Sequence, residues 1–115
     1  MNVELKEIWD NYPYAVTVSD VHGILVYMNK KAEATFDKWG GGDLIGKNMY
    51  DCHSQTSRDK MEVMLKTGTS NTYTIEKNGQ KKLIHQAPWF KNNEVAGLVE
   101  ISIVLPENMP HFIRG

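Results

Sequence analysis

The chain has 115 residues, of which 41% are hydrophobic and 23% charged, and its 13 basic and 14 acidic residues give a formal net charge of -1. These values are typical of one globular domain that buries roughly two-thirds of its unfolded surface. Because no basic cluster exceeds the pairs Lys30-Lys31 and Lys81-Lys82, neither nucleic acid nor an anionic membrane is expected as a direct partner.

Cysteine usage and the N-terminus indicate the compartment. Cys52 is the only cysteine, so no intramolecular disulfide can form. The N-terminus lacks a hydrophobic signal segment, and no apolar run approaches the roughly 20 residues of a membrane helix. We therefore expect a cytoplasmic, free-standing domain over residues 1–115, with a core at about 12–105, an N-terminal helix at 1–11 and a tail at 106–115.

The first predicted element is the short amphipathic helix within residues 1–11. Leu5, Ile8 and Trp9 recur at helical spacing, and Pro13 ends the helix because the residue before a proline disfavours helical backbone. A helix of this length is not stable alone. Its apolar face must therefore pack on its own sheet or on a second copy of the chain.

The next elements are two strands, over 15–19 and 24–28, followed by a helix. Asn29 is a favourable N-cap for this helix, which we expect to run to about Trp39. Ala32, Phe36 and Trp39 share one face of it. The glycine run at 40–42 then stops the helix, because ordering glycine costs backbone entropy.

A second helix is expected after a loop that contains Cys52 and His53. Thr56 and Asp59 have the spacing of a capping box, and Gly68 suits the C-cap. Met61, Met64 and Leu65 are the side chains that this helix should turn inward.

The remaining chain predicts a meander of strands over 72–77, 81–89 and 95–105. Asn78-Gly79 favours a tight type I′ hairpin, whereas 91–94 suggests a looser turn. In the last strand, the apolar side chains that share the expected core face are Val99, Ile101 and Ile103, with Glu100 and Ser102 opposite.

In this order and spacing, residues 8–105 resemble the PAS domain family. The resemblance implies an α+β fold with a five-stranded antiparallel sheet in the order 2-1-5-4-3, and short helices on one face over a small cavity. It further implies a module that senses a ligand, redox state or light and acts on a kinase, cyclase or regulator, as in two-component signalling or transcriptional regulation. The segments that carry it are Asp20-x-x-Gly23, Tyr27-x-Asn29, the helix with Phe36, Leu44-Ile45-Gly46-Lys47, Asn78-Gly79 and Pro88…Gly97-Leu98-Val99.

Many family members carry an output domain, and this sequence contains none. A complete protein of this length would have to act by contacting another protein. If the sequence is a piece of a longer chain, the output lies elsewhere. Both alternatives stay open.

The resemblance implies a cavity, and aromatic, methionine and histidine side chains are its candidate lining. Such side chains also fill ordinary cores, and both interpretations can hold together. Tyr73 and His85 are the polar tips expected to orient a small ligand or to bond each other. The full set of candidate ligand-binding residues is Tyr27, Phe36, Trp39, Met61, Met64, Tyr73, His85 and Ile101.

No cofactor is required by these residues. The light-sensing flavin branch of the family needs a cysteine where this chain has Met49, so adduct chemistry is not expected. A haem would need a histidine in the cavity, and His53 and His85 are the alternatives. Cys52 and His53 lack further ligands nearby, so no metal site is predicted.

No catalytic motif is present, and we expect a protein that is not an enzyme. The leading hypothesis is a sensor of a small ligand or cofactor that relays its state through protein contacts. The alternatives are a ligand-free docking or dimerisation domain and a haem-based redox or gas sensor. A homodimer is expected through Leu5, Ile8 and Trp9 and the outer sheet face, where Ala96 and Leu98 are expected to be exposed.

Overall fold

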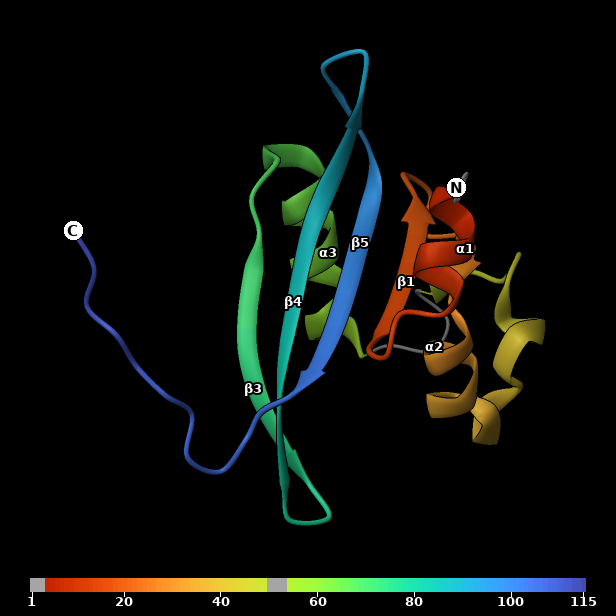
Figure 1. Ribbon diagram of the computed structural model, residues 1–115. Helices are drawn as coiled ribbons and strands as arrows, with labels where there is room; N and C mark the ends of the chain where they lie inside the picture. The colour runs from red at the N-terminus through yellow and green to blue at the C-terminus, as the bar shows by residue number, and fades with distance from the viewer. Residues whose placement is uncertain (1–3, 50–53) are drawn as a thin grey trace.

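The computed structural model describes residues 4–49 and 54–115, and its centre is an antiparallel sheet (Figure 1). The sheet has five strands in the order β2-β1-β5-β4-β3, which confirms the predicted α+β architecture and strand order. The strands are β1 (Ala15–Asp20), β2 (Leu25–Met28), β3 (Asn71–Lys77), β4 (Gln80–Lys91) and β5 (Glu94–Val104).

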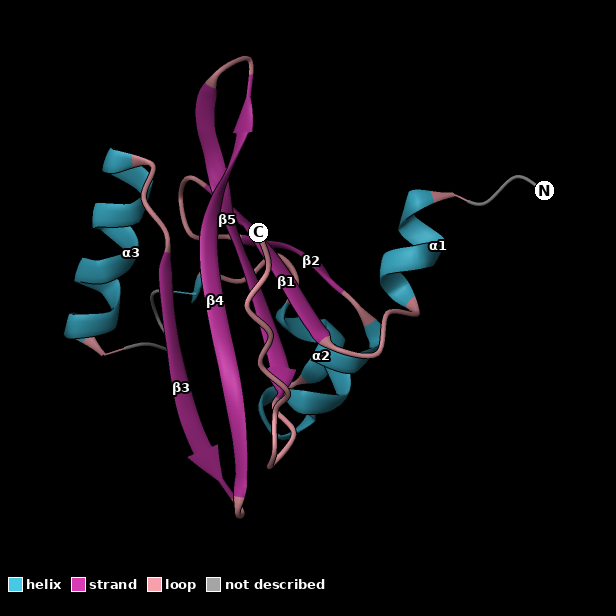
Figure 2. Ribbon diagram, turned by 60° about the vertical axis from the view of Figure 1, so that its left-hand side comes forward, coloured by secondary structure: helices cyan, strands magenta, loops and turns pink. Residues whose placement is uncertain are grey.

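Helices lie on both faces of this sheet, with α1 and α3 on opposite sides (Figure 2). Ala32 of α2 is fully buried against Ala15, Leu25 and Met28, which places α2 on the α3 side. The helices are α1 (Leu5–Asp10), α2 (Lys30–Thr35), η1 (Asp37–Trp39), η2 (Gly41–Leu44) and α3 (Gln55–Thr67), where η denotes a 3₁₀ helix.

Asn29 lies between β2 and α2 in the chain and is fully buried, and its side chain links α2 to β1 through hydrogen bonds. Its side-chain oxygen accepts from the backbone N–H groups of Ala32 at 2.9 Å and Val16 at 3.0 Å, and its amide donates to the Tyr14 carbonyl at 2.8 Å. The predicted N-cap is therefore confirmed. The same side chain also fixes the start of β1, a role that local sequence spacing does not indicate.

Two local predictions need correction. The N-cap of α3 is Ser54, whose hydroxyl accepts from Ser57 N, so the predicted capping box from Thr56 is wrong. The turn after β4 is tight rather than loose, because Lys91 pairs directly with Glu94 across Asn92 and Asn93. Both asparagines have positive φ, 53° and 65°, a conformation that asparagine tolerates better than most residues.

The faces of β5 are opposite to the prediction. Leu98 is only 6% exposed and packs against Met61 and Met64 of α3, so it is not on the outer face. Ile101 instead lies on the α1 side, in register with Val16. A row of apolar side chains indicates that this face of the strand is covered. It does not show whether the cover is a helix of the same domain or another protein surface.

The C-terminal residues 105–115 contain no helix or strand and run outward beyond β3 (Figure 1). Met109, Phe112 and Ile113 are exposed there. Among the described residues, no helix is long and apolar enough to cross a membrane.

Candidate functional site

A cavity of about 480 Å³ lies between the sheet and the helices on the α3 side. Its lining comes from strands β1, β2, β4 and β5, from Phe36 directly after α2, from η1 and η2, from residues 47–49, and from α3. The lining residues are Thr17, Ser19, Leu25, Met28, Phe36, Trp39, Leu44, Lys47, Asn48, Met49, Met61, Gln86, Leu98, Val99 and Glu100.

The helical side of the cavity is aromatic and methionine-rich. Phe36 and Trp39 form a tilted pair with ring centroids 6.3 Å apart, and Met61 projects from α3. Trp39 is 56% exposed, and the ammonium group of Lys77 lies 5.9 Å from the centre of its ring. Trp39 therefore contacts both the interior and the surface. Flexible methionines beside such rings can adapt to ligands of different shapes.

The sheet side of the cavity is polar. The Gln86 amide donates to a carboxylate oxygen of Glu100 at 2.8 Å, and the Gln86 oxygen accepts from Asn71 at 3.2 Å. Ser19 is 1% exposed, and its hydroxyl oxygen has no hydrogen-bond partner among the described residues. A buried hydroxyl without a partner is costly, and a ligand atom could satisfy it.

Residues 46–49, which we call the edge segment, close one side of the cavity along β2. Leu25 N donates to Lys47 O at 3.0 Å, and Gly46 N donates to Leu25 O at 2.7 Å. Met49 N donates to Gly23 O at 2.7 Å. These bonds hold Asn48 and Met49 in the cavity wall.

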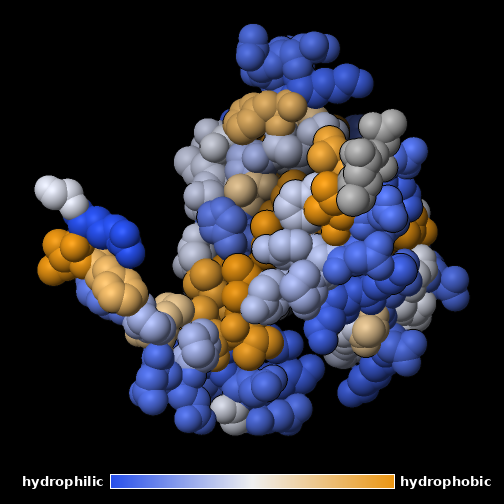
Figure 3. All heavy atoms as spheres, viewed as in Figure 1, coloured by the Kyte–Doolittle hydropathy of each residue, from blue (hydrophilic) through white to orange (hydrophobic). Residues whose placement is uncertain are grey.

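A second hollow lies on the opposite face, between α1 and the sheet. Its lining is almost entirely apolar apart from Lys6 and Tyr27, and consists of Lys6, Trp9, Val16, Val18, Tyr27, Val99 and Ile101. Apolar side chains also gather over β4 and β5 on this outer face (Figure 3). The hollow offers no polar site for orienting a ligand comparable to that of the first cavity.

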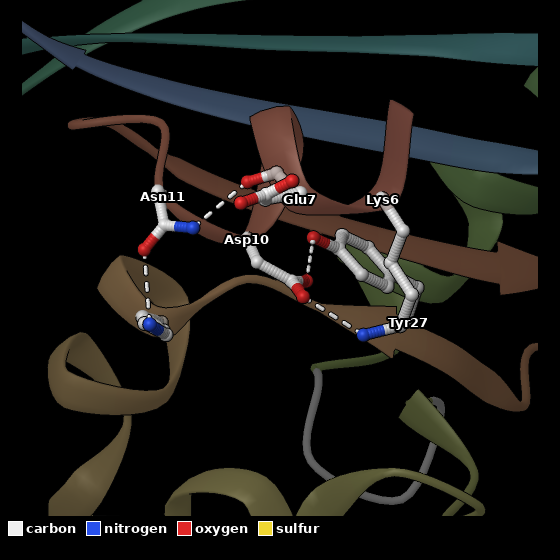
Figure 4. A network of polar contacts seen from close by, with 6 residues as sticks. Lys6, Glu7, Asp10, Asn11 and Tyr27 are labelled. Atoms are coloured by element: carbon white, nitrogen blue, oxygen red, sulfur yellow. Dashed lines mark hydrogen bonds and ion pairs between the residues drawn. The ribbon is translucent and has the colours of Figure 1, made fainter. Parts of the chain in front are cut away.

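Polar contacts hold α1 beside this hollow (Figure 4). The Tyr27 hydroxyl donates to one oxygen of Asp10 at 2.7 Å, and Lys6 donates to the other at 2.8 Å. Burial, together with the bond to Asp10, raises the pKa of Tyr27 to about 12. The bonds from Lys6 and Tyr27 lower the pKa of Asp10.

The structure brings some of the predicted site residues together and separates others. Phe36, Trp39 and Met61 line the cavity, while Met64 packs beside Met61 in the adjoining core. Tyr73 is 40% exposed on β3, and burial, followed by the negative charge of Glu100, raises its pKa. The role of these residues as ligand contacts stays a prediction.

The other candidates lie away from the cavity. Tyr27 and Ile101 line the hollow under α1. His85 is paired with Ile101 and shares its face, and its Nδ1 is 2.8 Å from the Thr72 hydroxyl rather than near Tyr73. The expectation that His85 lies in the cavity therefore does not hold. His53 and Cys52 lie outside the described residues.

The sequence did not predict the polar sheet side of the cavity. We call this surface the polar floor, and it consists of Thr17, Ser19, Gln86 and Glu100. The signal for it was Glu100, a charged residue in the middle of an apolar strand, together with the small polar residues Thr17 and Ser19 in β1. The alternation of the last strand places Glu100 opposite the expected core face, and no local pattern marks Thr17 and Ser19 as lining residues. Only the register of β1 and β5, which places Thr17 opposite Glu100, brings them onto one surface.

No protein-family model matches the chain, and no curated protein matches it. Several solved structures, in contrast, are similar to it in fold. A sensory box sensor histidine kinase from Vibrio cholerae is 16% identical, with a TM-score of 0.65 over 89% of this chain and 90% of that one. The Aer2 receptor from Vibrio cholerae, a dual PAS-heme oxygen sensor, is 13% identical, with a TM-score of 0.64 over 81% of this chain and 95% of that one.

VqmA of Vibrio cholerae, solved as a dimer, is 15% identical with a TM-score of 0.68, over 92% of this chain and 53% of VqmA. VqmA bound to DPO is similar at 16% identity and a TM-score of 0.68, over 90% of this chain and 58% of VqmA. The chain thus spans little more than half of VqmA. At these identities the likeness shows the fold, and the predicted PAS fold is confirmed.

Proposed function

We propose that this chain, which has the PAS fold, is a signalling module that binds a small molecule in the cavity under α2, η1 and α3. The observation that carries the proposal is the cavity itself. Its volume of about 480 Å³ lies within the roughly 300–1,000 Å³ of small-molecule sites. Apolar walls with a few converging polar groups are also the usual composition of such sites.

The comparisons support a sensing role without naming a ligand. VqmA binds DPO, and Aer2 is an oxygen sensor with haem. For this chain we propose that occupancy shifts the packing of α3 and the edge segment on the sheet. A partner such as a kinase, cyclase or regulator then reads this shift through protein contacts. A difference in ligand affinity equivalent to about 1–3 kcal/mol between the two states is enough for such a response.

Native mass spectrometry of freshly purified protein, with a visible absorption scan, tests this proposal. We expect a mass above that of the polypeptide, and loss of that adduct in Met61→Trp, which fills the cavity. Val63→Trp is the matched control, because Val63 is 55% exposed on α3. Circular dichroism verifies that both variants fold. A polypeptide that is ligand-free and fails to bind any member of a metabolite library would contradict the proposal.

The haem alternative receives no support from His85, because that side chain lies on the face opposite the cavity. His53 lies outside the described residues and stays a candidate ligand. A Soret band in the absorption scan that disappears in His53→Ala would favour haem. Its persistence in His85→Ala would agree with the geometry.

Homodimerisation or docking is the second candidate function, and the outer face of the sheet supports it. Val99, Ile101 and Ile103 alternate along β5 on this face, and Ile8 and Trp9 of α1 are 47% and 42% exposed. Exposed apolar surface of this kind is typical of protein interfaces. The proposed interface consists of α1 together with the outer face of β4 and β5, and it does not include Leu98, which packs against α3. This function is compatible with ligand binding on the other face.

A further inference from the structure

We propose that the cavity selects small molecules that carry a protonated amine on an apolar body, with Glu100 as the residue that recognises the amine. This inference rests on the proposed ligand-binding function and names the chemical class of the ligand. It is carried by the polar floor of the cavity, where a carboxylate and an unpartnered hydroxyl lie among apolar side chains.

The orientation of the Gln86 amide makes Glu100 an acceptor for a ligand. Asn71 donates to the Gln86 oxygen, so the Gln86 nitrogen faces Glu100 and donates to its Oε1 at 2.8 Å. An ionised carboxylate has two oxygens, each able to accept more than one hydrogen bond. Among the described residues, no donor contacts the second oxygen of Glu100. A donor from the ligand can therefore bind there without displacing a protein contact.

The charge of Glu100 is also uncompensated within the described part of the chain, where the ion pair that forms is Lys6–Asp10. Glu100 is partly buried, and a carboxylate in such a position is stabilised by a nearby cation or by further hydrogen bonds. Burial is the main cause that raises the pKa of the Tyr73 hydroxyl, and the negative charge of Glu100 adds to it. A protonated amine would supply both the missing charge and a charge-assisted hydrogen bond.

Ser19 provides a second point of attachment. It is 1% exposed, its hydroxyl has no described partner, and its carbonyl is already bonded to Trp89 Nε1 at 3.0 Å. Ser19 lies opposite Leu98, one step along the same face from the Thr17–Glu100 pair. Diagonal neighbours on a sheet face are about 7–8 Å apart. A hydroxyl or carbonyl group on the ligand can therefore reach Ser19 while the amine contacts Glu100.

Lys47 is the basic residue of the lining, and it favours the opposite selectivity. Its side chain is exposed, and it belongs to the edge segment rather than to the sheet floor. A solvated ammonium group on a flexible stem discriminates weakly between ligands. Glu100 is half-buried and held by Gln86, so we assign the selectivity to Glu100.

Matched probes test the assignment: 2-phenylethylamine, 2-phenylethanol and 3-phenylpropionate share an aromatic body and differ in charge. Affinities are measured by NMR titration of ¹⁵N-labelled protein. We expect the amine to bind roughly ten-fold or more tightly than the other probes, as a charge-assisted hydrogen bond implies. In Glu100→Gln this preference should fall to within about three-fold, because an amide keeps the bond to Gln86 but lacks the charge.

Glu62→Gln is the matched control, because Glu62 is exposed on α3 and does not line the cavity. It should retain the full preference for the amine. Equal binding of all probes to the wild type, or tighter binding of 3-phenylpropionate, would overturn this inference and leave the binding function intact. If no probe shifts the amide resonances of Met61 and Leu98, the inference fails, and the metabolite library separately decides whether the cavity binds small molecules at all.

Discussion

At the scale of single residues, Asn29 and Gly97 each hold together segments that are distant in the chain. Asn29 satisfies backbone groups of β1 and α2 from a fully buried position. Gly97 lets β5 approach β1 where the Ser19 carbonyl accepts from Trp89. Neither position tolerates an arbitrary side chain, because the surrounding groups have no alternative partners or space.

Asn29→Ala should lower the free energy of unfolding by about 2–4 kcal/mol. The substitution removes an N-cap and leaves Val16 N and the Tyr14 carbonyl without their side-chain partner. Urea unfolding followed by circular dichroism measures the loss. Asn11→Ala serves as a control, since the Asn11 side chain makes exposed hydrogen bonds. Equal stability of the Asn29→Ala variant and the wild type would show that the junction is not structural.

Gly97→Ala should destabilise the fold by about 3 kcal/mol. A Cβ atom at this position would overlap the Ser19 carbonyl oxygen and lie 2.6 Å from Trp89 Nε1. Gly79→Ala separates this clash from backbone strain, because Gly79 has a φ of 76° and no atom within 4 Å of its Cβ position. Gly79→Ala is expected to destabilise the fold by only about 1–2 kcal/mol, from backbone strain alone. A Gly97 variant no worse than the Gly79 variant would contradict the steric explanation.

At the scale of secondary-structure elements, α1 is the least integrated helix. It has no buried residue, and its docking depends on polar contacts with β2 and α2. The sequence predicts the helix and its apolar side but not the bond between Tyr27 and Asp10. Residues 17 apart in the chain carry no shared periodicity, so such a contact appears only when β2 is placed beside α1.

The docking of α1 should weaken at high pH. An unfolded tyrosine ionises near pH 10, whereas the pKa of Tyr27 in the fold is about 12. The raised pKa means that its contribution to stability is complete below pH 10 and is lost as pH rises toward 12 and beyond. Urea midpoints of the wild type and Tyr27→Phe should therefore converge over this interval. Parallel curves would show that the Tyr27 hydroxyl does not contribute.

The other elements show which local signals are sufficient. Asn78-Gly79 predicts its hairpin because both residues adopt the required positive φ, 53° and 76°. Gly68 likewise ends α3 in a left-handed conformation. The start of α3 was misplaced because Ser54 and Thr56 are both good caps. The faces of β5 were reversed because alternation identifies two faces without ranking them.

At the scale of the whole molecule, the two faces of the sheet serve different proposed roles. The α3 face encloses a cavity with a polar floor, and the outer face exposes apolar side chains around α1 (Figure 3). The overall architecture was predictable because turn signals, caps and strand patterns agree with one another. The cavity lining was only partly predictable, since it depends on register between distant strands.

Ile103→Glu should convert a homodimer into a monomer if the outer face is the interface. A carboxylate in an apolar contact loses its hydration without a partner. Size-exclusion chromatography with light scattering measures the change, and Val63→Glu on α3 is the matched control that should stay dimeric. Replacing Ile8 and Trp9 with serine tests the contribution of α1. A dimer that persists in both outer-face variants would place the interface elsewhere.

The edge segment gives this arrangement one more consequence. The amides of Leu25, Gly46 and Met49 donate hydrogen bonds that join residues 23–25 to the edge segment. Amides bonded in this way should exchange slowly with solvent. A molecule seated against Asn48 and Met49 must alter how often that seam opens, because these residues line the cavity. The rate of deuterium uptake at those amides should therefore report whether a ligand occupies the cavity. It can be measured in the native protein without any label on the ligand.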